Sequence, residues 1–229
     1  MSGSRRKLTD ALRRLREAFG PPDPPPVRDP FEVIIWENCA YLVDDHRRAQ
    51  VYRSLERRVG IEPSAIASAP PDLIRAILEP GGMHPEARAG KVRRSAELAL
   101  EVGIDQLRLS VSRTPVEARK LLKKFPGIGD PGADKILLLA GSKATLAPDS
   151  NALRVAQRLG YGEEFGDYGR SYRSCLEAVV GELAADCEVL LDAHALLRRH
   201  GQTICRRSAP RRDACPLTDS CRYYARLIG

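Results

Sequence analysis

The chain is poor in aromatic side chains, in long apolar runs and in strand-like patterns. Phe, Trp and Tyr make up only 5% of its 229 residues. No apolar stretch reaches the roughly 18 residues that a transmembrane helix needs, and the charged N-terminus lacks the apolar region of a secretory signal. Alternation of apolar and polar residues is almost absent, which argues against a sheet-rich fold. We therefore expect a soluble, cytoplasmic, helical protein without a membrane partner.

The charge is strongly positive. A net charge of +7 and a pI near 9.3 favour a polyanionic partner, because basic side chains release counterions when they bind phosphates. A basic surface that serves only solubility remains the alternative. With 43% hydrophobic residues, the chain can bury a core in one large domain or two small ones.

Proline and glycine divide the chain into short helices. Residues 8–19 have the pattern of a basic amphipathic helix, which the proline-rich segment 20–26 ends, so a boundary is expected near Arg28. Several short helices are predicted between Phe31 and Leu139. Further helices are predicted near residues 151–159, 172–183 and 187–200.

A glycine-containing turn joins two helical segments, residues 114–122 and 133–140. The turn reads Phe125-Pro126-Gly127-Ile128-Gly129. Gly127 and Gly129 permit positive φ values and close backbone approach. The following helix would present unpaired N–H groups at its N-terminus, to which a nucleic-acid phosphate can bind without any side chain.

Four motifs occur in an order that resembles the helix-hairpin-helix DNA glycosylases of the endonuclease III type. They are the early helical segment 31–37, the hairpin 125–129, the segment 147–154 and the pair His200-Gly201 before a cysteine loop. The resemblance implies an all-α, two-lobed fold that holds DNA between its lobes. Residues 29–145 would form a six-helix barrel with the helix-hairpin-helix, and residues 1–28 and 146–229 the second lobe.

Asp149 is the candidate catalytic residue. The resemblance places it beside the sugar of a nucleotide turned out of the duplex. Breaking an N-glycosidic bond builds positive charge on the sugar, which an ionised carboxylate stabilises while positioning water. Asp149 also fits an N-cap for the helix that opens at Ser150, and the two roles are compatible.

The family's lyase nucleophile is missing. Bifunctional members carry a lysine where this chain has Pro131, and proline has no amine for a Schiff base. Pro131 instead suits the first turn of a helix capped by Asp130. Lys135, one turn further on, is either a displaced nucleophile or a surface or phosphate-contacting lysine.

Several other residues are candidates for the site. Glu37 matches the position of a glutamate that protonates the departing purine in adenine-mismatch relatives, with a solvated helix face as the alternative. Tyr41 or Leu42 would fill the gap left by the flipped nucleotide, although core packing is equally open for Leu42. The remaining expected DNA contacts are Gly127, Ile128, Gly129, His84, Lys91 and Arg154. An exposed loop without function is the alternative for His84.

Six cysteines, in a chain expected to be cytosolic, are not interpreted as disulfides. Cys39 and Cys175 lie in helical stretches and are expected in the core. Cys205, Cys215 and Cys221 match three of the four ligands of the family's [4Fe–4S] cluster, whereas Arg212 replaces the second. The resemblance therefore allows a cluster whose fourth ligand is unidentified, with Asp213 and Cys187 as candidates. A loop without metal, or a zinc site that includes His200, are the alternatives.

The resemblance predicts a monofunctional DNA N-glycosylase of base-excision repair. It would act as a monomer on double-stranded DNA that contains a damaged or mismatched base, near the nucleoid in a bacterium or archaeon. One alternative is a protein of the same fold that binds damaged or bent DNA without cutting it. The other is a bifunctional glycosylase and AP lyase that uses Lys135. The target base is left open.

Overall fold

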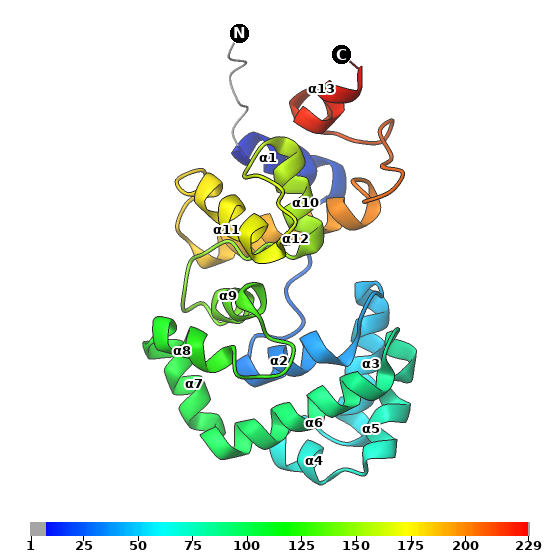
Figure 1. Cartoon of the computed structure of the whole chain (residues 1–229), viewed down its shortest axis with the longest axis vertical. Coiled ribbons are helices and arrows are strands. Elements are labelled where there is room, and N and C mark those ends of the chain that lie inside the picture. The colour runs from blue at the N-terminus through cyan, green and yellow to red at the C-terminus, as the bar shows by residue number, and fades with distance from the viewer. Residues whose placement is uncertain (1–7, 229) are drawn as a thin grey trace. The chain divides into compact units, whose positions relative to one another are not determined.

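The computed structural model describes residues 8–228, which fold into thirteen α-helices and two short 3-10 helices (Figure 1). Over this range the pairing of extended backbone is limited to one isolated bridge, between Tyr41 and Gly82. The predicted all-α class is confirmed. None of the described helices is long and apolar enough to cross a membrane.

Contacts between residues divide the chain into two compact units, residues 1–24 with 144–229, and residues 25–143. The second unit contains α2 to α9 and the 3-10 helix η1. Their bounds are α2 (Pro30–Cys39), α3 (Asp45–Arg58), α4 (Pro63–Ser68), α5 (Pro71–Leu78), η1 (Glu79–Gly81), α6 (Pro85–Val102), α7 (Ile104–Arg113), α8 (Pro115–Leu122) and α9 (Asp130–Leu139).

Proline starts many of the helices in this unit. It is the first residue of α2, α4, α5, α6 and α8, where its missing N–H costs no helical hydrogen bond. The long α6 packs against α2, α4 and α5. Helix α2 is buried on almost all sides, through Phe31, Val33, Ile34, Ile35 and Cys39, so it forms the centre of the core.

The first unit is built around α10 (Ser150–Leu159) and α12 (Cys187–Thr203), which share the most extensive helix contact in the chain. Helix α1 (Leu8–Phe19) packs on α12 through the buried stripe Leu8, Ala11 and Leu15. The unit also holds α11 (Tyr168–Val179), the 3-10 helix η2 (Thr218–Ser220) and α13 (Arg222–Ile228).

Helix α11 and the junction between α6 and α7 differ from the sequence prediction. Helix α11 begins at Tyr168 and ends at Val179, four residues earlier at each end than predicted, because Asp167 caps it through a hydrogen bond from Arg170 N–H. A further break falls at Gly103, which separates α6 from α7 with a φ of 85°. A single glycine within a helical pattern is a weak signal, so this break was not predicted.

Candidate active site

The carboxylate of Asp149 stands at the N-terminus of α10. Its Oδ1 accepts hydrogen bonds from the backbone N–H groups of Asn151, at 3.0 Å, and Ala152, at 2.9 Å. Its Oδ2 accepts one from Nε of Arg198 at 2.7 Å. The side chain is 19% exposed, so the charge is held firmly and still meets solvent. The predicted N-cap is confirmed, whereas the catalytic role stays a prediction.

Sequence reasoning missed two neighbours of Asp149. Arg198 comes from α12, and Tyr168 from the start of α11. Partial burial, together with the negative charge of Asp149, raises the pKa of Tyr168 to about 12. The Tyr168 ring stacks on Tyr172 at 6.4 Å between centroids. Only tertiary packing brings these residues to Asp149, so no local pattern marks them.

The hairpin is fastened to α2 through Asn38. Gly127 has a φ of 79°, and a Cβ there would lie 2.4 Å from Oδ1 of Asn38. The buried Asn38 amide donates to the carbonyl oxygens of Pro126, at 2.9 Å, and Ile34, at 3.0 Å. Ile128 is buried as an anchor, while Gly127 and Gly129 are exposed. The hairpin therefore presents its glycine backbone, and not the Ile128 side chain, to the surroundings.

The start of α9 differs from the prediction that Asp130 caps it. Gly129 is the N-cap and makes no side-chain hydrogen bond, and Asp130 is already the first helical residue. The Asp130 carboxylate instead pairs with Lys123 at 2.6 Å and Arg119 at 3.0 Å. Contact with the Lys123 ammonium, aided by Arg119, lowers the pKa of Asp130. Asp130 thus ties α8 to α9 across the hairpin.

Glu37 and Lys135 form one ion pair. Nζ of Lys135 lies 2.9 Å from each carboxylate oxygen of Glu37, where α2 packs against α9. The side chains are 15% exposed for Lys135 and 24% for Glu37, so neither is the solvated surface residue of the alternative predictions. A paired ammonium is protonated, whereas a Schiff base requires the neutral amine. The pair therefore opposes a nucleophilic role for Lys135.

Known proteins of similar sequence bear on these features. No family model matches the chain. It is 26% identical over 226 residues to the thymine/uracil-DNA glycosylase of Pyrobaculum aerophilum, and the alignment covers 95% of this chain and 92% of the relative. It is 27% identical over 201 residues to endonuclease III of Sulfolobus acidocaldarius, and that alignment covers 86% of this chain and 83% of the relative.

The fold agrees with these relatives. A trapped endonuclease III–DNA covalent intermediate superposes with a TM-score of 0.74, at 19% identity over 97% of both chains. A thermostable thymine-DNA glycosylase superposes with a TM-score of 0.70, at 19% identity over 96% of this chain and 97% of the other. In sequence and in fold, the chain is similar to the endonuclease III-like helix-hairpin-helix glycosylases.

In this endonuclease III-like chain, a backbone hydrogen bond joins the loop after α2 to the loop before α6. The N–H of Tyr41 donates to the carbonyl of Gly81 at 2.8 Å beside the Tyr41–Gly82 bridge. Leu42 is 71% exposed with a φ of 58°, so its predicted alternative of core packing is wrong. Tyr41 and His84 are also exposed, with ring centroids 6.4 Å apart. A non-glycine residue at positive φ is strained, and both Leu42 and His84 adopt it.

Arg88 braces these loops from inside the protein. Its buried guanidinium donates to four backbone carbonyls, those of Cys39 at 2.6 Å, Leu78 at 2.8 Å, Gly82 at 2.9 Å and Met83 at 2.8 Å. Burial lowers the pKa of Arg88. Sequence reasoning missed this residue because nothing local distinguishes a bracing arginine from a surface one. Lys91, one turn later on α6, is exposed, as a DNA contact requires.

Arg154 does not have the exposed position that its predicted DNA contact implies. Its guanidinium donates to the carbonyl oxygens of Gly201 at 2.7 Å and Cys205 at 2.9 Å, and to Oδ1 of Asn151 at 2.9 Å. These bonds satisfy carbonyls at the C-terminus of α12. Arg154 therefore joins α10 to α12 and is a structural residue in this arrangement.

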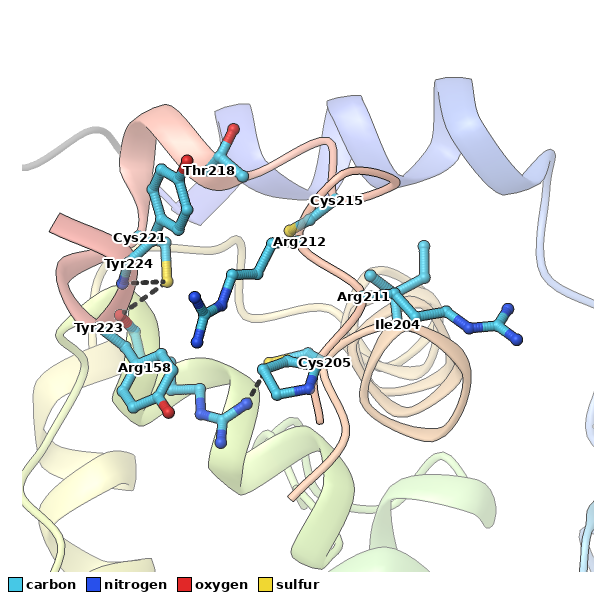
Figure 2. A pocket seen from close by; sticks show the side chains of 11 residues that line it. Arg158, Ile204, Cys205, Arg211, Arg212, Cys215, Thr218, Cys221, Tyr223 and Tyr224 are labelled. Carbon is cyan, nitrogen blue, oxygen red and sulfur yellow. Dashed lines mark hydrogen bonds between the residues drawn. The ribbon is translucent and has the colours of Figure 1, made fainter. Parts of the chain in front are cut away.

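The three C-terminal cysteines line a small pocket. Cys205, Cys215 and Cys221 share it with Arg158 and Arg212, and the Arg212 side chain points into it among the cysteines (Figure 2). Nη1 of Arg158 lies 3.2 Å from Sγ of Cys205.

These residues do not fit a [4Fe–4S] cluster. Such a cluster takes four thiolates, and here the second ligand position holds a cation. Burial raises the pKa of the Cys215 and Cys221 thiols, which opposes the thiolate form. Between residues 8 and 228, no three His, Cys, Asp or Glu side chains are placed to hold a metal ion.

The proposed substitutes for the missing ligand are not suitably placed. Cys187 opens the 17-residue α12 and Cys205 follows its end, so about 25 Å of helix separates them. Asp213 is exposed on the loop. His200 is buried, and its Nε2 lies 3.7 Å from Sγ of Cys215, but the zinc alternative finds no third ligand in the described residues. Burial lowers the pKa of His200 to about 4. Cys39 and Cys175 are buried free thiols, as predicted.

Proposed function

We propose that this protein is a monofunctional DNA N-glycosylase of base-excision repair, acting as a monomer on duplex DNA in the cytoplasm. The observation that supports this best is the Asp149 carboxylate, fixed at a helix N-terminus in a chain of this family. The related protein named a thymine/uracil-DNA glycosylase makes a mismatched uracil or thymine the first substrate to test.

In the proposed reaction, the enzyme turns the target nucleotide out of the duplex, since the bond to be broken is inaccessible in the stack. Cleavage of the N-glycosidic bond leaves positive charge on the sugar. The ionised Asp149 stabilises that charge and orients a water molecule for attack on the anomeric carbon. The base leaves with the bonding electrons, the water oxygen bonds to the anomeric carbon, and the proton that the water loses neutralises the departing base.

The proposed DNA contacts come from the second unit. The exposed backbone of Gly127 and Gly129, next to the N-terminus of α9, suits a phosphate. Leu42 and Tyr41 are the proposed wedge that occupies the space of the flipped nucleotide, supported by their exposure and by the braced loop that carries them. His84 and Lys91 are proposed as further contacts with the DNA backbone.

We propose that the reaction ends at base release, without strand cleavage. Pro131 offers no amine, and both carboxylate oxygens of Glu37 contact Nζ of Lys135, which opposes the use of Lys135 as a nucleophile. The same contact engages the Glu37 carboxylate, so we assign Glu37 no acid role. We also propose that the cysteine loop folds without an iron–sulfur cluster, supported by the position of Arg212.

The test is base release from a duplex with uracil opposite guanine, and from matched duplexes with thymine, hypoxanthine and alkylated purines. Asp149→Asn keeps the N-cap acceptor and removes the charge, so we expect a folded protein with base release reduced at least about a hundredfold. Asp186→Asn is the matched control, because Asp186 caps α12 in the same way.

Undiminished release by Asp149→Asn would refute the catalytic assignment. Tight binding of lesion DNA without release from any duplex would favour the non-cutting DNA-binding alternative. Borohydride trapping of a covalent adduct that is lost on Lys135→Ala would refute the monofunctional proposal.

A further inference from the structure

Asp149 is held by an arginine that belongs to a different helix. Nε of Arg198, on α12, donates to Oδ2 of Asp149 at 2.7 Å, and each side chain is 19% exposed. The two residues are 49 positions apart in the chain. The other carboxylate oxygen is taken by the two N–H groups of α10. Both oxygens therefore have fixed donors, and rotation of the carboxylate group would break at least one set.

The close packing of α10 and α12 makes this contact. A Cβ on Gly201 would lie 2.6 Å from the carbonyl oxygen of Asn151, so only glycine lets the helices approach this closely. Arg154 locks the same junction by donating to the Gly201 carbonyl at 2.7 Å. Arg198 lies three residues before Gly201 and therefore projects from nearly the same side of α12, toward the start of α10.

The Arg198 guanidinium is itself oriented. Gln202 follows one turn later on α12, and its amide satisfies hydrogen bonding with the oxygen turned toward Arg198. In that orientation the oxygen accepts from Nη1 at 3.2 Å and Nη2 at 3.3 Å. Nε is thus directed at the carboxylate while the outer nitrogens are held by Gln202. An arginine fixed on two sides has little freedom to leave the pair.

The charges around Asp149 decide what such an arginine can do. Within this unit, the charged and titratable groups that act on it include Arg198 from α12, Arg154 from α10 and Tyr168 from α11. Burial lowers the pKa of Arg154. A guanidinium next to the carboxylate offsets part of its negative charge, so Arg198 does not add to the stabilisation of a cationic sugar. Its contribution lies in keeping the carboxylate ionised and in one orientation.

We infer that Arg198 is a positioning residue, which sets the orientation and the charge state of the Asp149 carboxylate for glycosidic cleavage. The inference rests on the proposed function for its role in catalysis. It goes beyond that function because it assigns a positioning role to a residue that lies outside the four sequence motifs. Gln202 and Gly201 support it by orienting the guanidinium and by setting the distance between the helices.

Replacing Arg198 by glutamine removes the cation and leaves a shorter, neutral polar side chain. Without the cation, Asp149 binds a proton more readily, so its titration midpoint should rise by about one pH unit or more. Arg198→Lys keeps the charge but loses the planar donor set, so we expect an intermediate midpoint. Arg199→Gln is the matched control, since Arg199 points to the Phe19 carbonyl at 2.9 Å.

The midpoint is measured without DNA, by carbon-13 NMR of the full chain with labelled aspartate carboxyl groups. The Asp149 resonance is assigned by its absence in Asp149→Asn. The same variants are then assayed for single-turnover release of uracil from a uracil–guanine duplex across pH. We expect Arg198→Gln to release base about tenfold more slowly at neutral pH, with unchanged DNA affinity. The pH below which its rate of base release falls should rise by the same amount as the titration midpoint of Asp149.

An unchanged midpoint in Arg198→Gln, or unchanged base release across the pH range, would overturn the inference. If Arg198→Gln does not fold, an Arg198→Lys midpoint and rate equal to those of the wild type would overturn it as well. A shifted midpoint in a protein that releases no base from any duplex would separate the two claims. The contact with Asp149 would then stand, whereas the proposed function would fail.

Discussion

Replacing Gly127 by alanine should destabilise the helix-hairpin-helix through two separate effects. The left-handed backbone at Gly127, with a φ of 79°, costs a residue with a Cβ about 1–2 kcal/mol. The new Cβ would also lie 2.4 Å from Oδ1 of the buried Asn38, which has to move. That movement weakens the Asn38 bonds to Pro126 and Ile34, each contributing about 1 kcal/mol.

A smaller effect opposes these losses. Alanine restricts the unfolded chain and so stabilises the protein by about 0.4–1 kcal/mol. The net loss expected for Gly127→Ala is about 2–3 kcal/mol in the free energy of unfolding. Urea denaturation followed by circular dichroism measures it.

Gly129→Ala is the matched control two residues away. Its φ is −91°, and the atom nearest to an added Cβ is Cδ of Pro131 at 3.9 Å, so the stability should change by less than about 0.5 kcal/mol. An equal loss in both variants would refute the reasoning. Because Gly129 is exposed on the hairpin, Gly129→Ala should still weaken binding to duplex DNA if the backbone contacts phosphate.

Three further predictions concern the charged and thiol groups. Freshly purified wild type should lack iron and visible iron–sulfur absorption, whereas Arg212→Cys, which completes the four-cysteine spacing, should gain both; iron in the wild type would contradict this. Burial lowers the pKa of His200 to about 4. As the pH drops, His200 therefore binds a proton in the unfolded chain, at about pH 6.5, before it does so in the folded protein. The free energy of unfolding should fall by about 3 kcal/mol between about pH 6.5 and pH 4. Urea titrations of His200→Gln should lack that part of the pH dependence, and an unchanged slope would argue against it. Lys135→Met should lower the free energy of unfolding by about 2 kcal/mol, because the partly buried Glu37 loses the ammonium that contacts both of its oxygens. A double variant with Glu37→Gln should recover part of that loss, and strict additivity of the two changes would contradict the coupling.

The local motifs of the fold could be predicted because each depends on neighbouring residues. Proline at a first helical turn, glycine at positive φ and aspartate before a helix act within a few positions, as Pro131, Gly127 and Asp149 do here. The same locality explains the error at Asp130. A carboxylate next to a helix start fits a cap, but Lys123 and Arg119 compete for it.

The all-α class, the hairpin, the N-cap at Asp149 and the loss of both the family lysine and one family cysteine follow from the order of the residues. Which charged side chains meet depends on how the helices pack. Arg198 reaches Asp149 across 49 positions, and Lys135 reaches Glu37 across 98. These pairs depend on how closely two helices pack and on which rotamers their neighbours allow. An ion pair between distant helices therefore leaves no periodicity in the sequence from which it could be predicted.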